Sequence, residues 1–184
     1  MRPSQPKILL LYKISTYAYY FNANRRDAKH PVPVKSMVRF KKTHLQHYKT
    51  LVQVEEFLRK QNIRYSRSRR GQKIDFSKFD FVITVGGDGT FLEAARYCTN
   101  QVILGINSDP GWSVGRFCAA NDKTFPKLLE DMFNKKTPIR NLNRLKLRIP
   151  ARGGSAPGGK GRPEAVNVLN DALVCHVNPA AMSR

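Results

Sequence analysis

The stretch VGGDGTFLEAARY, residues 85–97, combines residue types that can do chemistry on a phosphate. Gly86 and Gly87 end an apolar run, and Asp88 and Gly89 follow before a series of helix formers. Glycines let the backbone approach a ligand closely, and the first amides of a helix attract phosphate. A carboxylate placed there can take the proton of an attacking hydroxyl or serve Mg²⁺ held by phosphates. The stretch therefore predicts a phosphoryl-transfer site with Asp88 as its catalytic residue.

A purely structural interpretation of this turn also stays open, in which the glycines form a tight turn and Asp88 caps the helix. The spacing does not match the dinucleotide-binding GxGxxG pattern, and no Lys-Ser/Thr pair follows as in a Walker loop. A second glycine-rich stretch, residues 154–160, satisfies GxxxxGK. Gly161 occupies its Ser/Thr position and no helical pattern follows, so we expect an ordinary loop there.

The strands that would position Asp88 are marked by apolar runs without alternation, which is typical of strands buried on both faces. These runs lie at residues 7–12, 79–85 and 101–107. Helical patterns separate them along the chain. Alternating strands and helices predict an α/β fold with a doubly wound parallel sheet, which we assign to residues 1–140.

Two helices are predicted from apolar residues that recur at steps of three and four, at residues 43–61 and 121–136. Thr43 is a candidate cap for the first helix, and Asn121 or Asp122 for the second. A third helix is expected to follow the glycine turn directly. The segment 13–40 shows no clear period and contains two prolines, so we expect a long connection.

The pattern changes beyond residue 140. Residues 142–149 and 164–177 are strand-like, and no helical pattern lies between them. The intervening loop is rich in glycine and proline. We therefore interpret residues 141–184 as the beginning of a β-rich, antiparallel second domain.

The composition is strongly basic, with 33 Lys and Arg against 13 Asp and Glu and a net charge of +20. Such a charge attracts nucleic acid, anionic membranes or nucleotide phosphates, although it can also form a solvated basic face. The densest cluster, residues 64–73, contains one aromatic residue and so lacks the stacking platform of single-strand binders. His44 and His47 lie one helical turn apart without an HExxH pattern, and three scattered cysteines give no zinc framework. No apolar stretch approaches the ~20 residues that cross a bilayer.

Several motifs taken together resemble the NAD kinase family. They are VGGDGTFLEAARY, ILGINSDP, GRFCAA and VLNDALV, in this order. GINSDP, LND and NPAAMSR are similar to a divergent branch of the family that includes mitochondrial NAD kinases and the plant NADH kinase. GGDGT alone is shared with diacylglycerol and sphingosine kinases, so the other motifs make the resemblance specific.

The resemblance implies an ATP-dependent kinase that phosphorylates NAD⁺ or NADH at the adenosine-ribose 2′-hydroxyl, with ATP and Mg²⁺ as cofactors. Asp88 corresponds to the catalytic carboxylate, and Asn170 and Asp171 match the pair that binds the ribose hydroxyls. An amide beside a carboxylate suits a diol, because both hydroxyls can donate to it. No residue is assigned as a protein metal ligand. The nucleotide-binding residues expected in this sequence are Gly86, Gly87, Gly89, Thr90, Asn107, Asn170 and Asp171.

The resemblance also sets expectations for the rest of the molecule. The family continues into a segment rich in Gly, Ser and Thr, so we expect the second domain to be incomplete at Arg184. We expect nucleotides as partners, a homodimer, no specific nucleic acid and no membrane. A cytoplasmic location is favoured, with mitochondria as the alternative because the first 73 residues are basic and poor in acids. Two rival functions remain: a GGDGT-type lipid kinase, and an inactive fragment that binds nucleotides or nucleic acid.

Overall fold

The computed structural model describes residues 6–21, 34–149 and 164–171. The chain divides into two compact units, Met1–Arg140 and Asn141–Arg184. The strands of the first unit are β1 (Ile8–Tyr12), β2 (Tyr65–Arg69), β3 (Phe81–Gly86), β4 (Val102–Asn107) and β5 (Ala120–Asn121). Its helices are α1 (Thr16–Phe21), α2 (Val34–Lys60), the 3₁₀ helix η1 (Phe76–Lys78), α3 (Asp88–Tyr97) and α4 (Phe125–Phe133).

The first unit is built on a five-stranded sheet in which every neighbouring pair is parallel, in the order β2-β1-β3-β4-β5. The predicted α/β fold with a parallel sheet is therefore confirmed. The three apolar runs form its central strands β1, β3 and β4, and almost every residue in them is buried. Since all strands run the same way, the residues that follow them gather at one edge, which we call the carboxyl edge.

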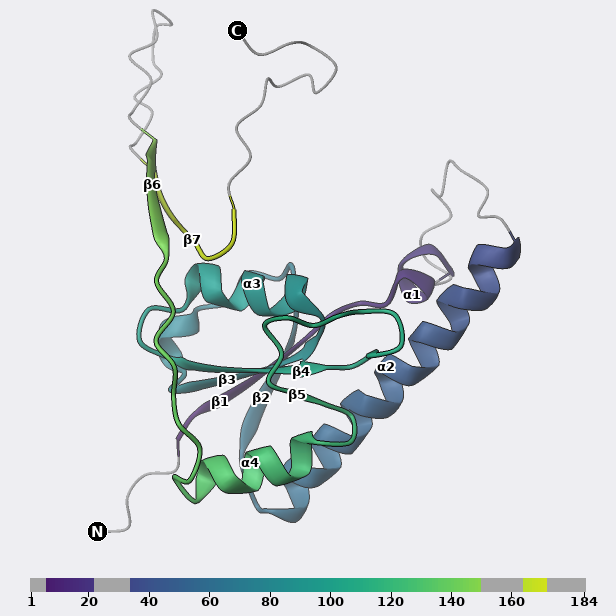
Figure 1. Ribbon diagram of the computed structural model, residues 1–184, viewed down its shortest axis with the longest axis horizontal. Coiled ribbons are helices and arrows are strands. Elements are labelled where there is room, and N and C mark those ends of the chain that lie inside the picture. The colour runs from purple at the N-terminus through teal and green to yellow at the C-terminus, as the bar shows by residue number, and fades with distance from the viewer. Residues whose placement is uncertain (1–5, 22–33, 150–163, 172–184) are drawn as a thin grey trace, which may run out of the picture. The chain divides into compact units, whose positions relative to one another are not determined.

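Helices cover both faces of this sheet (Figure 1). On one face α2 and α4 pack against alternate strand residues such as Leu10, Ile83 and Ile106. On the other face α3 packs against the intervening residues, including Leu11 and Val82. This two-sided covering explains the continuous apolar runs, because every strand residue has a helix or loop to bury it.

Helix α2 begins at Val34, nine residues before the predicted start at Thr43, so the prediction of a connection through residue 40 was wrong. Thr43 is not a cap: it lies within the helix, and its hydroxyl donates to the Phe40 carbonyl at 3.1 Å. Residues 35–42 have no fully buried side chain and leave no apolar period to detect. Instead of the sheet, this part of α2 contacts the rings of α1, as in the stacked pair Tyr20 and Phe40. Within the described part of the chain, no helix is both long and apolar enough to cross a membrane.

Strand β2 was missed in the sequence because it lies within the most basic cluster of the chain. It is the outermost strand on the β1 side of the sheet and pairs with β1, and charged side chains are common on outermost strands. The guanidinium of Arg67 lies over the ring of Tyr12, 4.6 Å from its centroid, and pairs with Glu55 of α2 at 3.3 Å. Part of the basic cluster is thus a structural element of the sheet.

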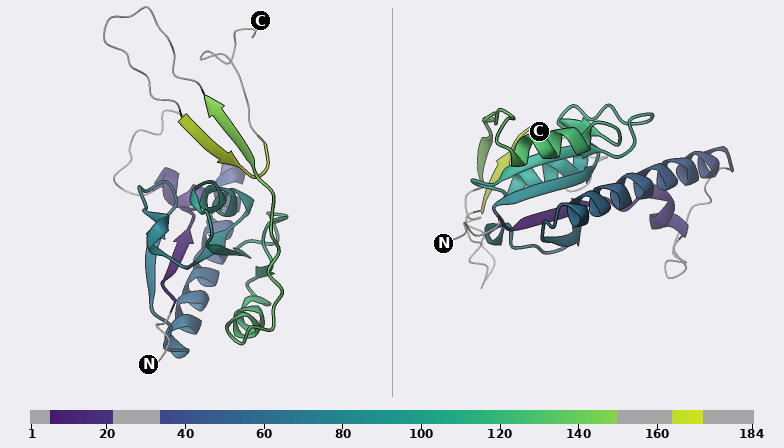
Figure 2. Two further views of the ribbon diagram at one scale, coloured as in Figure 1. Left: turned by 90° about the vertical axis from the view of Figure 1, so that its left-hand side faces the viewer. Right: turned by 90° about the horizontal axis from the view of Figure 1, so that it is seen from below.

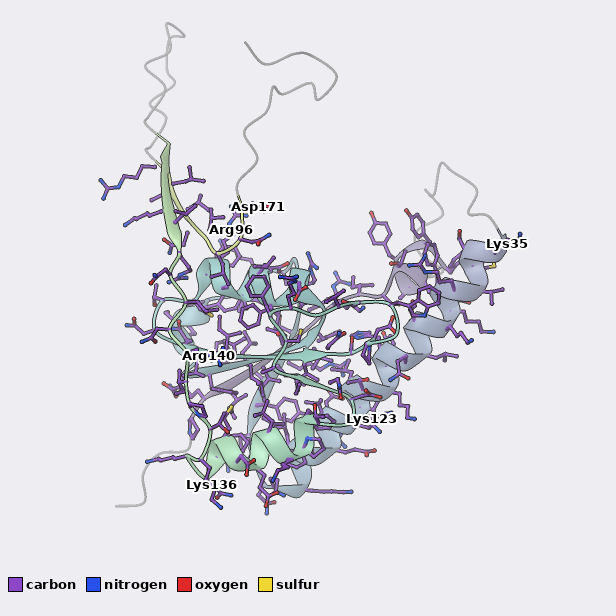
Figure 3. The ribbon with its side chains drawn as sticks, in the orientation of Figure 1. Lys35, Arg96, Lys123, Lys136, Arg140 and Asp171 are labelled. Atoms are coloured by element: carbon purple, nitrogen blue, oxygen red, sulfur yellow. The ribbon has the colours of Figure 1, made fainter. Side chains whose placement is uncertain are left out.

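Helix α4 is shorter than the predicted 121–136, and neither Asn121 nor Asp122 is its cap. Asn121 belongs to β5, and its side-chain oxygen accepts the amides of Lys123 and Thr124 at 2.9 and 3.1 Å. These bonds form a turn before the helix, so the cap position falls on Thr124. Figure 3 shows Lys123 and Lys136 at the two ends of α4.

The second unit contains two described strands, β6 (Leu145–Ile149) and β7 (Glu164–Val168). They pair in an antiparallel register, as the opposed arrows in Figure 2 show. This agrees with the antiparallel pairing predicted for the region. The remainder of the predicted strand 164–177, from residue 172 on, and the glycine-rich loop at 154–160 lie outside the described residues.

Candidate active site

The glycine turn joins β3 to α3 at the carboxyl edge. Gly87 occupies the N-cap position of α3, and its carbonyl accepts the amide of Thr90 at 3.0 Å. A Cβ on Gly86 would overlap the hydroxyl of Thr90, which is only 1% exposed and cannot move aside. A Cβ on Gly87 would lie 2.7 Å from the Ser113 hydroxyl. Gly86 is therefore required by close packing at the turn, whereas the Ser113 hydroxyl beside Gly87 belongs to a partly exposed side chain that can turn aside.

Asp88 is the first residue of α3, and its carboxylate is held by two backbone amides. Its Oδ1 accepts the amide of Phe117 at 2.8 Å, and its Oδ2 accepts that of Arg116 at 3.0 Å. The side chain makes no capping bond to its own helix, whose cap residue is Gly87. Because a carboxylate has about four lone-pair positions, two remain for a hydroxyl or a cation. The carboxylate is thus fixed in orientation, half-buried, and still able to accept.

Asn107 lies beside this turn, since it is paired with Gly86 in the register of β3 and β4. Its amide nitrogen donates to the Ser113 carbonyl at 2.7 Å, and its oxygen accepts the amide of Asp109 at 3.1 Å. Gly115 has a φ of +63°, and a Cβ there would lie 2.5 Å from the Asn107 nitrogen. Asn107 and Asp88 together fasten the loop 108–119 to the carboxyl edge.

His47 of α2 is completely buried behind this edge. Its Nε2 lies 3.0 Å from the Lys13 carbonyl and its Nδ1 lies 2.8 Å from the Ser108 hydroxyl. Because a carbonyl can only accept, Nε2 carries the proton and Nδ1 accepts from Ser108. Burial, followed by the charge of Lys13, lowers the pKa of His47 to about 4. The ring is therefore a neutral link between α2 and the ends of β1 and β4.

The two histidines have separate hydrogen-bond partners. His44 has its own partner, the Ser15 hydroxyl at 2.6 Å from Nδ1, while His47 uses both ring nitrogens as described. Across the described ranges, no group of three or more His, Cys, Asp or Glu gathers as a metal site. Their spacing is explained by one turn of α2.

Charged side chains surround the same edge. The amide of Lys13, directly after β1, donates to the Val85 carbonyl of β3 at 3.2 Å. Burial lowers the pKa of Lys13, Asp109 opposes that shift, and Arg70 adds to it. Burial raises the pKa of Asp109, against the opposing charges of Lys13 and Arg39. Arg70 follows β2 and pairs with Glu93 of α3 at 3.0 Å. Cations from the ends of two strands thus accompany the glycine turn.

The structure brings together six of the sequence-predicted residues and leaves two in the other unit. The six at the carboxyl edge are Gly86, Gly87, Asp88, Gly89, Thr90 and Asn107. Asn170 and Asp171 lie just beyond β7 in the second unit, after Leu169, where both are exposed and Asp171 is labelled in Figure 3. The sequence analysis missed Lys13, His47 and Arg70. Signals were present for two of them, because Lys13 follows a fully apolar strand and Arg70 lies in the most basic cluster of the sequence.

A doubly wound parallel sheet with this turn at its carboxyl edge places the first unit among α/β domains that bind ligands beyond the carboxyl ends of their strands. The family described as the ATP-NAD kinase N-terminal domain matches residues 24–136. The chain therefore belongs to the NAD kinase family.

Relatives of this chain include two plant proteins. It is 30% identical over 162 residues to the NADH kinase of Arabidopsis thaliana, covering 78% of this chain and 50% of that protein. It is 31% identical over 121 residues to the probable NADH kinase of Oryza sativa subsp. japonica, covering 57% and 34%. The chain thus spans between a third and a half of the length of these relatives. Among solved structures, an NAD kinase from Archaeoglobus fulgidus in complex with ATP matches with a TM-score of 0.41 and 19% identity, over 77% of this chain and 41% of that one.

Proposed function

We propose that this chain carries out, or contributes the first domain to, ATP-dependent phosphorylation of NAD⁺ or NADH at the 2′-hydroxyl of the adenosine ribose. The observation that supports this most is the Asp88 carboxylate, which two backbone amides hold beside a glycine turn at the carboxyl edge. Membership of the NAD kinase family and the similarity to plant NADH kinases support the choice of substrate.

Asp88 acts in this proposal as the base. The amides of Asp88 and the exposed Gly89, at the start of α3, bind the donor phosphates, because they present partial positive charge and Gly89 has no Cβ in the way. As the ribose oxygen bonds to the γ-phosphorus, the bond from that phosphorus to the ADP oxygen breaks. The hydroxyl proton passes to Asp88. The products are NADP⁺ or NADPH, and ADP.

Magnesium suits the donor set at Asp88. Mg²⁺ prefers oxygen ligands and is commonly held by one or two carboxylates together with substrate phosphates. Asp88 offers one carboxylate with two uncommitted lone-pair positions, and no cluster of three or more acidic, His or Cys side chains lies among the described residues. We therefore propose that Asp88 and the donor phosphates would hold the ion, which neutralises phosphate charge when bound.

Asn170 and Asp171 are proposed to bind the ribose diol. Both are exposed at the end of β7, so their amide and carboxylate are accessible to a ligand. Asn107 has a different part, because both ends of its amide are engaged with the loop 108–119. Its proposed contribution to binding is to hold this loop, and with it Arg116 and Phe117, in place.

The decisive experiment is NADP(H) formation by the Asp88→Asn variant. Loss of the base is expected to lower the rate about 10²–10⁴-fold, as for other positioned acids and bases. Binding of ATP measured without divalent ions should stay within a few-fold, because the backbone amides are unchanged. Asp80→Asn is the matched control: Asp80 directly precedes β3, is exposed, and lies at the opposite edge of the sheet. Near-normal turnover in Asp88→Asn, at unchanged melting temperature, would show that the assignment is wrong.

Removal of divalent ions tests the proposed role of Mg²⁺. With EDTA in excess, phosphate transfer should stop, and added Mg²⁺ should restore it. Assays with NAD⁺ and NADH side by side then decide the acceptor, and ATP against other phosphate donors decides the donor. Transfer that continues at full rate in EDTA contradicts the proposed role of Mg²⁺.

Two further properties are proposals, the oligomeric state from the resemblance to the family and the location from the charge pattern of the sequence. We propose a homodimer, which light scattering after size exclusion would detect as twice the chain mass. We also propose a cytoplasmic location, with mitochondria as the alternative; imaging of a tagged protein with a mitochondrial marker distinguishes the two.

A further inference from the structure

The topology marks one position along the carboxyl edge. From β1 the chain crosses by α2 on one face to β2, whereas from β3 it crosses by α3 on the other face to β4. The order 2-1-3-4-5 therefore reverses direction between β1 and β3. In open α/β sheets, the connections from two such strands leave toward opposite faces, and ligands bind in the crevice outside the strand ends.

The residues on the two sides of this crevice are the glycine turn after β3 and Lys13 after β1. Lys13 is bonded across it, since its amide donates to Val85 at 3.2 Å. Its carbonyl accepts Nε2 of the buried His47 at 3.0 Å. Both peptide groups of Lys13 are thus fixed, and the side chain begins from a rigid position beside Gly86 and Gly87.

The charges of Lys13 and Asp88 both act on Cys118, which lies on the loop at the carboxyl edge. Burial raises the pKa of the Cys118 thiol to about 11, with Asp88 raising it further and Lys13 lowering it, so both charges act on one sulfur atom. Arg70 is a second cation nearby: its amide donates to Tyr12 at 2.9 Å, and its Nη1 lies 3.0 Å from where a Cβ on Gly89 would be. Two cations thus flank the turn that carries Asp88.

In the protein without ligand, the charged form of the Lys13 side chain is disfavoured. Burial is the larger cause that lowers its pKa, and Arg70 adds to the shift, while Asp109 only partly opposes them. A half-buried cation next to another cation is stabilised by an anion that fits between them. A phosphate group supplies that charge, and lysine binds phosphate as a compact point charge.

We propose that Lys13 is a binding residue for the donor's polyphosphate, placed across the crevice from Asp88 so that the phosphates lie between the ends of β1 and β3. The inference rests on the proposed function for the identity of the donor, but it predicts binding, which can be measured without transfer. Arg70, which is paired with Glu93, contributes positive charge near the phosphates but is not proposed to bind them directly.

The test compares Lys13→Met with Lys7→Met by calorimetry, using ATP and inorganic tripolyphosphate as probes. Each variant loses one positive charge, but Lys7 lies at the opposite end of β1 from Lys13. The bond from Lys7 to Asp80 uses only the backbone amide, so Lys7→Met leaves it intact. Lys13→Met is expected to weaken both probes about tenfold or more, as for the loss of a charged hydrogen bond. Lys7→Met should stay within about twofold.

Folding is controlled by thermal melting and by a second variant. Because Lys13 is charged at a cost in the free protein, Lys13→Met should melt at the same temperature or higher, and Lys13→Arg should bind both probes more tightly than Lys13→Met. Unchanged affinity in Lys13→Met overturns the inference, and so does a loss confined to ATP, which would place Lys13 at the nucleoside. A wild-type chain that binds neither probe also overturns it.

The two proposals fail in different ways. If Lys13→Met weakens both probes but no variant or wild-type chain forms NADP(H), the polyphosphate site stands and the proposed reaction does not. If transfer depends on Asp88 while Lys13→Met binds normally, the reaction stands and Lys13 has no part in it.

Discussion

The two edges of the parallel sheet are built by different means. At the carboxyl edge, buried polar side chains meet behind the glycine turn, namely Ser15, His47, Asn107, Ser108 and Asp109. At the amino edge, the bond from the Lys7 amide to Asp80 is exposed, and so are most polar groups nearby. A cavity of about 360 Å³ there is lined by Pro6, Phe57, Ile63 and Phe133 together with the polar Gln61, Glu130 and Asn134. Burying polar groups costs free energy unless they are bonded. The carboxyl edge therefore carries a cost that stability alone does not require, which is common at functional sites.

Lowering the pH is expected to have the largest effect on unfolding free energy, because it tends to charge the buried His47. The pKa of His47 is about 4 in the folded protein and about 6.5 in the unfolded chain, so the unfolded chain binds more protons between these values. Unfolding free energy is therefore expected to fall by about 3 kcal/mol as the pH drops from 7 to below 4. Urea titrations across this range measure it. His47→Gln should remove most of the dependence of unfolding free energy on pH. His44→Gln should remove less of it, because the His44 ring is less buried, although its pKa is also lowered.

Gly86→Ala tests the packing of the glycine turn. The added Cβ would collide with the buried Thr90 hydroxyl, and overpacking of this kind costs about 1–3 kcal/mol. Gly111→Ala, on the loop at the same edge, is the control because nothing lies within 4 Å of its new Cβ. Equal melting temperatures for the two variants would show that the turn is looser than the structure indicates.

Asp80→Ala probes the amino edge and should have the smallest effect. It removes an exposed bond of 2.8 Å to the Lys7 amide, and exposed interactions of this type contribute under about 1 kcal/mol. A loss of stability as large as that of Gly86→Ala would remove the contrast between the two edges. Urea unfolding at neutral pH is sufficient to decide.

The sequence predicts the central sheet well because β1, β3 and β4 are buried on both faces and so are apolar throughout. It fails where packing is partial. The first part of α2 contacts the aromatic rings of α1 and not the sheet, so it has no amphipathic period. Strand β2 carries charges because it is the outermost strand of the sheet. Neither element contains the local signal on which such predictions depend.

The site shows the same division. Gly86, Gly87 and Asp88 could be predicted because a turn and a helix start are local features. Lys13 and His47 come from segments more than 30 residues away, and only the pairing of β1 with β3 and the burial of α2 bring them to the turn. Long-range pairing of this kind leaves no mark in the spacing of residues along the chain.

The loop 108–119 has a practical consequence. Its ends are fastened by Asn107 and Asp88, whereas Trp112, the only tryptophan of the sequence, lies on it with 56% of its surface exposed. The guanidinium of Arg39 lies over its ring, 4.3 Å from the centroid. Indole emission excited at long wavelength therefore arises from this loop alone, and the unlabelled protein contains an optical reporter beside the edge where nucleotides are proposed to bind.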